Sequence, residues 1–119
     1  MVLLIDTNII LDVLQNRSEH YNHSKQVLDT CKEKNVQGYL AAHSITNLWY
    51  ILKKTHSDEQ RRSLIKALLT YFDVVSLDKT KIQSALDKND FKDFEDCLQD
   101  ECASEIQADC IVTRNARDF

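Results

Sequence analysis

Four short apolar runs along the chain predict β-strands. Residues 2–5 form a continuous apolar run that stops at Asp6, which is typical of a strand buried on both faces. Residues 74–77 and residues 110–113 combine β-branched and other apolar residues, and residues 37–41 are a weaker candidate. These runs are spread from the beginning of the chain to its end.

The segments between these runs carry apolar residues at helical spacing. Residues 42–54 show the clearest pattern, in which four apolar side chains share one helix face: Ile45, Leu48, Trp49 and Leu52. Ser57 and Gln60 have the spacing of a capping box that opens the next helix. Weaker helical patterns cover residues 20–34 and residues 96–107.

The alternation of apolar strands with helices predicts an α/β fold. We expect a mainly parallel sheet that helices cover on both sides. No linker, repeat or low-complexity segment divides the chain, so residues 1–119 are predicted to form a single domain. Ligands of such sheets bind beyond the carboxyl ends of the strands, and the residues that follow each strand are therefore the candidates for chemistry.

The composition argues against several classes of fold and function. One glycine and no proline argue against an all-β sandwich or barrel, whose tight turns use these residues. The net charge of −4 argues against a broad basic face for nucleic acid, so a polyanion would need a local patch or bound cations. No apolar run approaches a membrane span, and we expect a cytoplasmic protein with reduced thiols, in which Cys97, Cys102 and Cys110 pack inside.

Acidic residues stand at the ends of predicted elements that a parallel sheet would bring together. Asp6 follows the first strand, Asp93 and Asp96 open the helix before the last strand, and Asp118 follows that strand. Carboxylates about 4 Å apart repel by roughly 4 kcal/mol at an effective dielectric of about 20, and a hard cation such as Mg²⁺ or Mn²⁺ would offset this repulsion.

Each acid also has a simpler interpretation. Asp6 could cap the following helix, because aspartate accepts hydrogen bonds from the free amides of a first turn. Acids in the first turn of a helix, such as Asp96, are favoured by the helix dipole alone. Asp118 could be a solvated surface residue.

Three segments together resemble the PIN domain family. They are residues 4–12 (LIDTNIILD), residues 93–99 (DFEDCLQ) and residues 111–119 (IVTRNARDF). The resemblance runs from residue 2 to residue 119, and the branch that it most resembles is that of the bacterial VapC toxins. It implies a three-layer α/β/α sandwich around a mainly parallel sheet of four or five strands, and a metal-dependent ribonuclease that cleaves single-stranded RNA.

The resemblance also implies the roles of individual acids. Asp6, Asp96 and Asp118 match the first, third and fourth acids of the family, which makes them the expected catalytic ligands of Mg²⁺ or Mn²⁺. Asp93 is an accessory candidate, because it lies about one helical turn before Asp96.

Other catalytic and substrate-binding candidates surround these acids. Thr113 and Asn115 match polar residues that line the family's site beside the last acid. Asn47 departs from the family, which usually has glutamate at this position in the segment HSITNLWY. Arg114 and Arg117 flank the proposed cleft and are expected to contact RNA phosphates.

The resemblance further implies a cognate antitoxin and a homodimer. Because the amide of Asn47 carries no charge, the alternative function is a catalytically weak or inactive PIN-like module that binds RNA or protein. A strand followed by Asp-Thr-Asn is also faintly similar to the haloacid-dehalogenase phosphatases, but Asn8 stands where that family needs a second aspartate.

Overall fold

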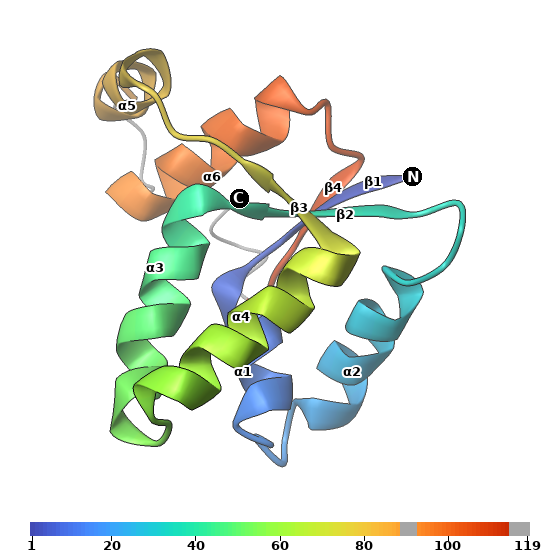
Figure 1. Cartoon of the computed structure of the whole chain (residues 1–119). Coiled ribbons are helices and arrows are strands. Elements are labelled where there is room, and N and C mark those ends of the chain that lie inside the picture. The colour runs from blue at the N-terminus through green and yellow to red at the C-terminus, as the bar shows by residue number, and fades with distance from the viewer. Residues whose placement is uncertain (89–92, 115–119) are drawn as a thin grey trace.

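Strands and helices alternate along the chain in the structure, a computed structural model that describes residues 1–88 and 93–114. In chain order the elements are β1 (Val2–Ile5), α1 (Thr7–Leu14), α2 (Tyr21–Thr30), β2 (Gln37–Ala41), α3 (Ala42–Ile51), the 3₁₀ turn η1 (Leu52–Lys54), α4 (Asp58–Tyr71), β3 (Phe72–Val75), α5 (Lys79–Leu86), α6 (Phe94–Glu105) and β4 (Cys110–Val112). Figure 1 shows how these elements surround the sheet.

The described strands form one four-stranded sheet in the order β3-β2-β1-β4, and all three pairings are parallel. The central strand β1 places Leu4 opposite Tyr39 of β2 and Ile111 of β4. The carboxyl ends of all four strands therefore meet at one edge of the sheet, as the sequence predicts.

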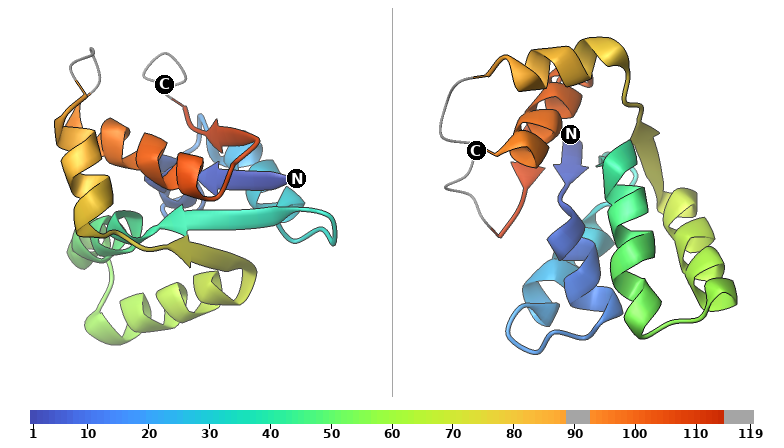
Figure 2. Two further views of the ribbon diagram at one scale, coloured as in Figure 1. Left: turned by 90° about the horizontal axis from the view of Figure 1, so that it is seen from above. Right: turned by 90° about the vertical axis from the view of Figure 1, so that its left-hand side faces the viewer.

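Helices cover both faces of this sheet (Figures 1 and 2). Successive side chains of β1 point to opposite faces, so Leu3 and Ile5 pack with residues of α1 to α4. Leu4 packs instead with Cys102 and Ile106 at the end of α6. A smaller cluster joins α5 to α6 through Ala85, and the predicted three-layer α/β/α fold is thus confirmed.

The hydrophobic pattern predicts most of these elements but misses α1. This helix is only eight residues long, with Ile9, Ile10 and Leu11 buried in succession, so it is too short to show a repeated helical spacing. The strand β3 begins earlier than expected, at Phe72. Gly38, the only glycine of the chain, lies opposite Phe72 on β2, and a Cβ added at Gly38 would lie 2.9 Å from the Phe72 ring.

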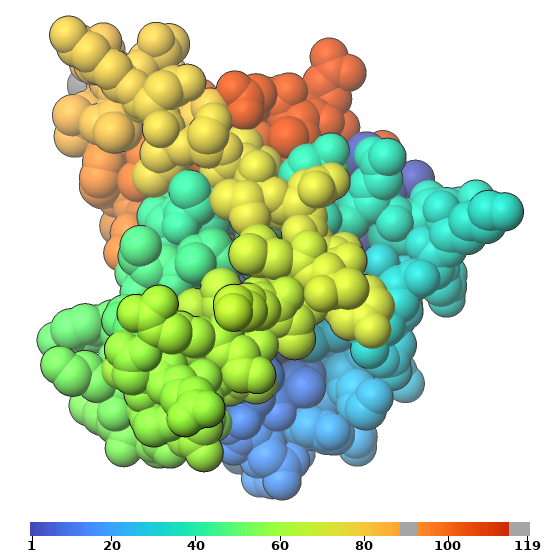
Figure 3. All heavy atoms as spheres, viewed as in Figure 1, coloured from blue at the N-terminus to red at the C-terminus, as the bar shows by residue number. Residues whose placement is uncertain are grey.

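The predicted capping box is present at the start of α4. The Gln60 amide donates to Ser57 Oγ at 3.1 Å, and the Ser57 amide donates to Gln60 Oε1 at 2.8 Å. Arg61 then packs over the Trp49 ring, 4.0 Å from its centre, and donates to the Trp49 carbonyl at 3.0 Å. These contacts join α4 to α3, which together cover much of the face seen in Figure 3.

All four cysteines lie in the described residues, and each carries a thiol rather than a disulfide. Cys31 and Cys102 are buried, and burial raises the pKa of each thiol to about 11. The expectation that Cys110 packs inside is wrong: it is exposed, because β4 is an edge strand of the sheet that the described residues form. Among the described residues, no helix combines the length and apolar character needed to cross a membrane.

Candidate functional site

Asp6 lies at the junction of β1 and α1, where it both caps the helix and places a carboxylate at the carboxyl edge of the sheet. Its backbone is extended, and its side chain accepts a hydrogen bond from the Thr7 amide at 2.8 Å, so it caps α1. The capping interpretation of Asp6 is therefore correct. The same geometry places its carboxylate at the positive end of the α1 dipole, at the carboxyl edge of the sheet.

Two further donors orient the Asp6 carboxylate. Thr113, directly after β4, donates from Oγ1 to Asp6 Oδ2 at 3.0 Å. Gln99 of α6 places Nε2 3.5 Å from Asp6 Oδ1. The contacts to this carboxylate from residues 1–88 and 93–114 thus come from a hydroxyl and two amides, and none comes from a lysine or arginine.

The Asp6 carboxylate lines a hollow of about 260 Å³ at this edge of the sheet. The hollow is lined by three regions of the chain: two of them supply acids, and the amides come from Asn8, beside Asp6, and from Asn47. Its lining comprises Asp6, Thr7, Asn8, Leu11, Asn47, Ile51, Asp93, Glu95 and Asp96. The structure therefore brings together four of the predicted site residues, which come from the β1 end, α3 and the start of α6.

Asp93 and Asp96, the two predicted acids at the start of α6, have different surroundings. Asp93 is the cap of α6 and accepts the Asp96 amide at 2.8 Å, which holds the first turn in place. Asp96 is partly buried within that turn and lines the hollow. Both carboxylates stand at the positive end of the α6 dipole, which stabilises negative charge there.

His43 and Gln99 belong to the surroundings of the hollow and were not predicted from the sequence. Burial lowers the pKa of His43 below its ordinary value of 6.5, and the Glu95 and Asp6 carboxylates oppose this shift. Gln99 is buried, and its Oε1 has no hydrogen-bond partner among the described residues. The available signal for Gln99 was its position one helical turn after Asp96.

The side chains that line the hollow are of the types that bind a hard cation. All its polar side chains offer oxygen atoms from carboxylates, amides or a hydroxyl, which are the ligands that Mg²⁺ and Mn²⁺ prefer. However, within residues 1–88 and 93–114 no three His, Cys, Asp or Glu side chains lie close enough to hold one metal ion. Asn115, Arg117 and Asp118 lie outside the described residues.

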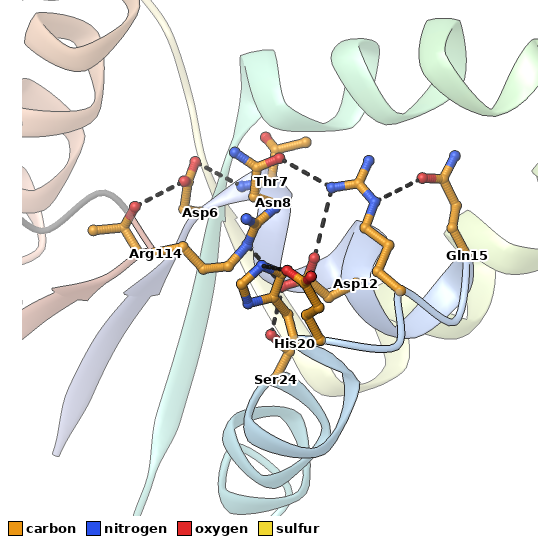
Figure 4. A network of polar contacts seen from close by, with 11 residues as sticks. Asp6, Thr7, Asn8, Asp12, Gln15, His20, Ser24 and Arg114 are labelled. Carbon is orange, nitrogen blue, oxygen red and sulfur yellow. Dashed lines mark hydrogen bonds and ion pairs between the residues drawn. The ribbon is translucent and has the colours of Figure 1, made fainter.

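Arg114 does not line the acidic hollow. Its Nε lies 3.0 Å from Oδ2 of Asp12, a buried acid of α1, so part of its guanidinium is already paired inside the protein (Figure 4). The expectation that Arg114 contacts RNA phosphates stays a prediction.

The comparisons with known proteins identify the family. A family model described as the PIN domain matches residues 2–117. The chain belongs to the PIN domain family. The family predicted from the three sequence segments is therefore confirmed.

Solved structures show the same fold. VapBC2 from Rickettsia felis, bound to a DNA fragment from its promoter, matches 100% of this chain and 91% of that chain, with 19% identity and a TM-score of 0.71. A toxin–antitoxin complex from Klebsiella pneumoniae matches 98% of this PIN domain and 89% of that chain, with 20% identity and a TM-score of 0.75. The comparison with curated proteins finds no match.

Proposed function

We propose that this PIN domain is a metal-dependent endoribonuclease that hydrolyses single-stranded RNA, and that it is the toxin of a toxin–antitoxin pair. One observation carries the nuclease proposal: Asp6 and Asp96, which are far apart in the sequence, line one hollow at the carboxyl edge of a parallel sheet. Such clustered acids favour a divalent cation, and a cation there would attract the phosphodiester that the acids alone would repel.

In this proposal Asp6, Asp96 and Asp118 hold one or two Mg²⁺ or Mn²⁺ ions, with Asp93 as an accessory ligand. A bound divalent ion supplies a water of lowered pKa for attack on phosphorus and neutralises the charge that develops on the phosphate. The oxygen-rich lining of the hollow supports this choice of metal.

The neighbouring polar residues orient the reacting groups. Thr113 fixes the Asp6 carboxylate through its hydroxyl, so that one carboxylate oxygen has a defined direction. Asn47 presents its amide to the hollow, and we assign Asn115 a similar orienting role. Arg114 and Arg117 are the proposed contacts for RNA phosphates.

The toxin assignment rests on the similar structures. Both are toxin–antitoxin assemblies, and each resembles this chain over nearly its whole length, which supports a cognate antitoxin as partner. A homodimer and a cytoplasmic location are further parts of the proposal.

A weak or inactive binding module is the second candidate, and Asn47 favours it. The side chain lines the hollow where a family member usually offers a carboxylate, so the site carries one negative charge fewer. A loss of one ligand charge weakens the hold on a divalent cation.

The test is cleavage of a fluorescent single-stranded RNA by the wild type, Asp6→Asn and Asp96→Asn, with Mg²⁺ and Mn²⁺ compared. Asparagine at position 6 still caps α1, so the fold should remain. The matched control is Asp29→Asn, which removes an exposed acid of α2 that pairs with Lys25 of the same helix and with Lys32 just after it.

We expect metal-dependent cleavage by the wild type and by the control. In both site variants we expect the cleavage rate to fall by about 100-fold or more, which is the typical effect of removing one strong electrostatic contribution to catalysis. Equal cleavage by Asp6→Asn, or cleavage that a chelator leaves unchanged, would overturn the proposal. No cleavage by the wild type, together with binding of the same RNA, would favour the binding module.

A further inference from the structure

A second group of charged side chains lies beside the acidic hollow and centres on Asp12 (Figure 4). Asp12 belongs to α1 and has no exposed surface. Its Oδ2 accepts a hydrogen bond from Ser24 Oγ at 2.7 Å and lies 3.0 Å from Arg114 Nε. Its Oδ1 lies 3.6 Å from Arg17 Nη1.

These two arginines explain how a carboxylate can be buried at this position. An isolated charge inside a protein is strongly unfavourable unless it is paired and hydrogen-bonded. Arg17 and Arg114 are themselves only about one-third exposed, at 34% and 28% of their side chains, so their attraction to Asp12 is less screened than that of a surface pair.

Both arginines also lead to the acidic hollow. Arg114 directly follows Thr113, the residue whose hydroxyl holds Asp6 Oδ2. Arg17 places Nη1 3.5 Å from Asn8 Oδ1, and Asn8 lines the hollow. Asp12 is therefore connected through Arg114 to Thr113, which holds Asp6, and through Arg17 to Asn8, which lines the hollow.

The end of β4 makes a further contact with Asp6. The Asp6 amide donates to the Val112 carbonyl at 3.0 Å, so backbone and side-chain bonds tie the same three-residue segment to the site. Arg114 ends this segment and anchors it to α1 through Asp12.

We infer that Asp12 is a positioning residue of the site: its pair with Arg114 fixes the end of β4 and thereby the direction of Thr113 toward Asp6. Its pair with Arg17 does the same for Asn8. The effect on catalysis rests on the proposed function, whereas the effect on the end of β4 is a property of the fold and can be measured by itself.

The first measurement is hydrogen exchange of single backbone amides in Asp12→Asn, which keeps the size of the side chain and removes its charge. The Asp6 amide reports on the end of β4, and the Gln37 amide, bonded to the Met1 carbonyl at the opposite edge of the sheet, reports on the rest of the sheet. We expect Asp6 to exchange about tenfold faster or more, with Gln37 unchanged. Asp29→Asn, the matched control, should change neither amide.

The second measurement is the Mn²⁺ concentration that gives half-maximal RNA cleavage. Loss of a residue that orients a ligand typically costs about 10- to 100-fold in metal affinity or activity, so we expect this concentration to rise in Asp12→Asn while KM for RNA changes little. A pair that only stabilised the fold would lower the melting temperature without changing the metal dependence of the folded protein. Ser24→Ala, which removes one hydrogen bond and keeps the charge, should show the same changes to a smaller extent.

The outcomes separate this inference from the proposed function. Faster exchange at Asp6 alone supports positioning even if the wild type cleaves no RNA, in which case the proposed function fails. Unchanged exchange at Asp6, or equal acceleration at Asp6 and Gln37, overturns the positioning role. The nuclease activity measured for the wild type, and with it the proposed function, is not affected by that result. If Asp12→Asn does not fold, Ser24→Ala decides by the same exchange criteria.

Discussion

Asp6 and Asp12 both belong to the segment that forms α1, but the protein surrounds their charges in opposite ways. Asp6 is held by a hydroxyl and amides and lines a hollow with further acids. Asp12 is buried and faces two arginines. Where the chain supplies its own cations, a carboxylate can fix the fold. Where the described residues offer only neutral donors and more acids, as at Asp6, the negative charge is available to a cation from solution.

The largest expected effect is on stability, from removal of the buried acid. Asp12→Ala leaves Arg17 and Arg114 without their partner in a partly buried environment, and breaking such a pair typically costs about 3–5 kcal/mol. Urea denaturation should show this loss in the free energy of unfolding. Asp29→Ala, at an exposed pair, should cost less than about 1 kcal/mol. Equal losses in the two variants would contradict the stabilising role of the buried pair at Asp12.

The next effect is stabilisation of the wild type by Mn²⁺. A ligand that binds only the folded state adds about 2.7 kcal/mol when its concentration is about 100 times its Kd. The melting temperature should therefore rise with Mn²⁺ in the wild type and not in Asp6→Asn. Asp12→Asn should still respond, but only at higher Mn²⁺ concentration. A rise of equal size in Asp6→Asn would place the bound ion elsewhere.

A smaller effect is expected from restoring a charge to the hollow. Asn47→Glu adds a carboxylate to the lining, so it should strengthen Mn²⁺ binding by about tenfold, or about 1.4 kcal/mol. Without metal the same change should lower stability slightly, because it adds repulsion. Isothermal titration calorimetry measures the affinity, and Asn47→Gln, which keeps the amide, is the control. No gain in affinity would show that the missing charge does not limit the site.

The smallest effect concerns a third charged group, remote from the hollow. Lys81 is nearly buried, and its Nζ lies 2.7 Å from Glu105 Oε1 and 3.3 Å from Asp78 Oδ2. Hydrogen bonding to Glu105 raises the pKa of Lys81 above 10.5. The bond from the Lys81 amide lowers the pKa of Asp78 below 3.8.

The directions of these two pKa shifts set the pH range in which the third charged group stabilises the protein. The Lys81 contribution is complete below pH 10.5 and is lost as pH rises through the pKa of the folded state. The Asp78 contribution is complete above pH 3.8 and is lost as pH falls through its lowered pKa. The melting temperature of Lys81→Met should be below that of the wild type near neutral pH, and the difference should shrink in strong alkali. The exposed Lys79→Met is the control, and a difference independent of pH would contradict the assignment.

The sequence was sufficient for the α/β fold class and for bringing Asp6 and Asp96 to one hollow, because both depend on local patterns and one general rule, whereas Asp118 lies outside the described residues. Apolar runs locate the strands, and parallel strands bring their carboxyl ends to one edge, which places Asp6 beside Asp96. The family motif then distinguishes Asn47 from the other amides of the chain.

The partners of Asp12 could not be predicted in the same way. Its contact with Arg114 joins opposite ends of the chain, and nothing in the local pattern selects one arginine over another. The signal that was available is an aspartate inside the apolar run of α1, which indicates burial but not its partner. The exposure of Cys110 was missed for a related reason, since a strand sequence does not reveal whether the strand lies at the edge of its sheet.

The direction of β1 has a practical consequence for attaching a label to the protein. The strand runs from the Met1 end, where the terminal ammonium donates to the Asn35 carbonyl at 2.8 Å, to Asp6 at the opposite edge. A fluorophore, an affinity handle or a surface linker attached ahead of Met1 would therefore be separated from the acidic hollow by the full length of the strand. Immobilised in this orientation, the protein would leave that hollow open to solution.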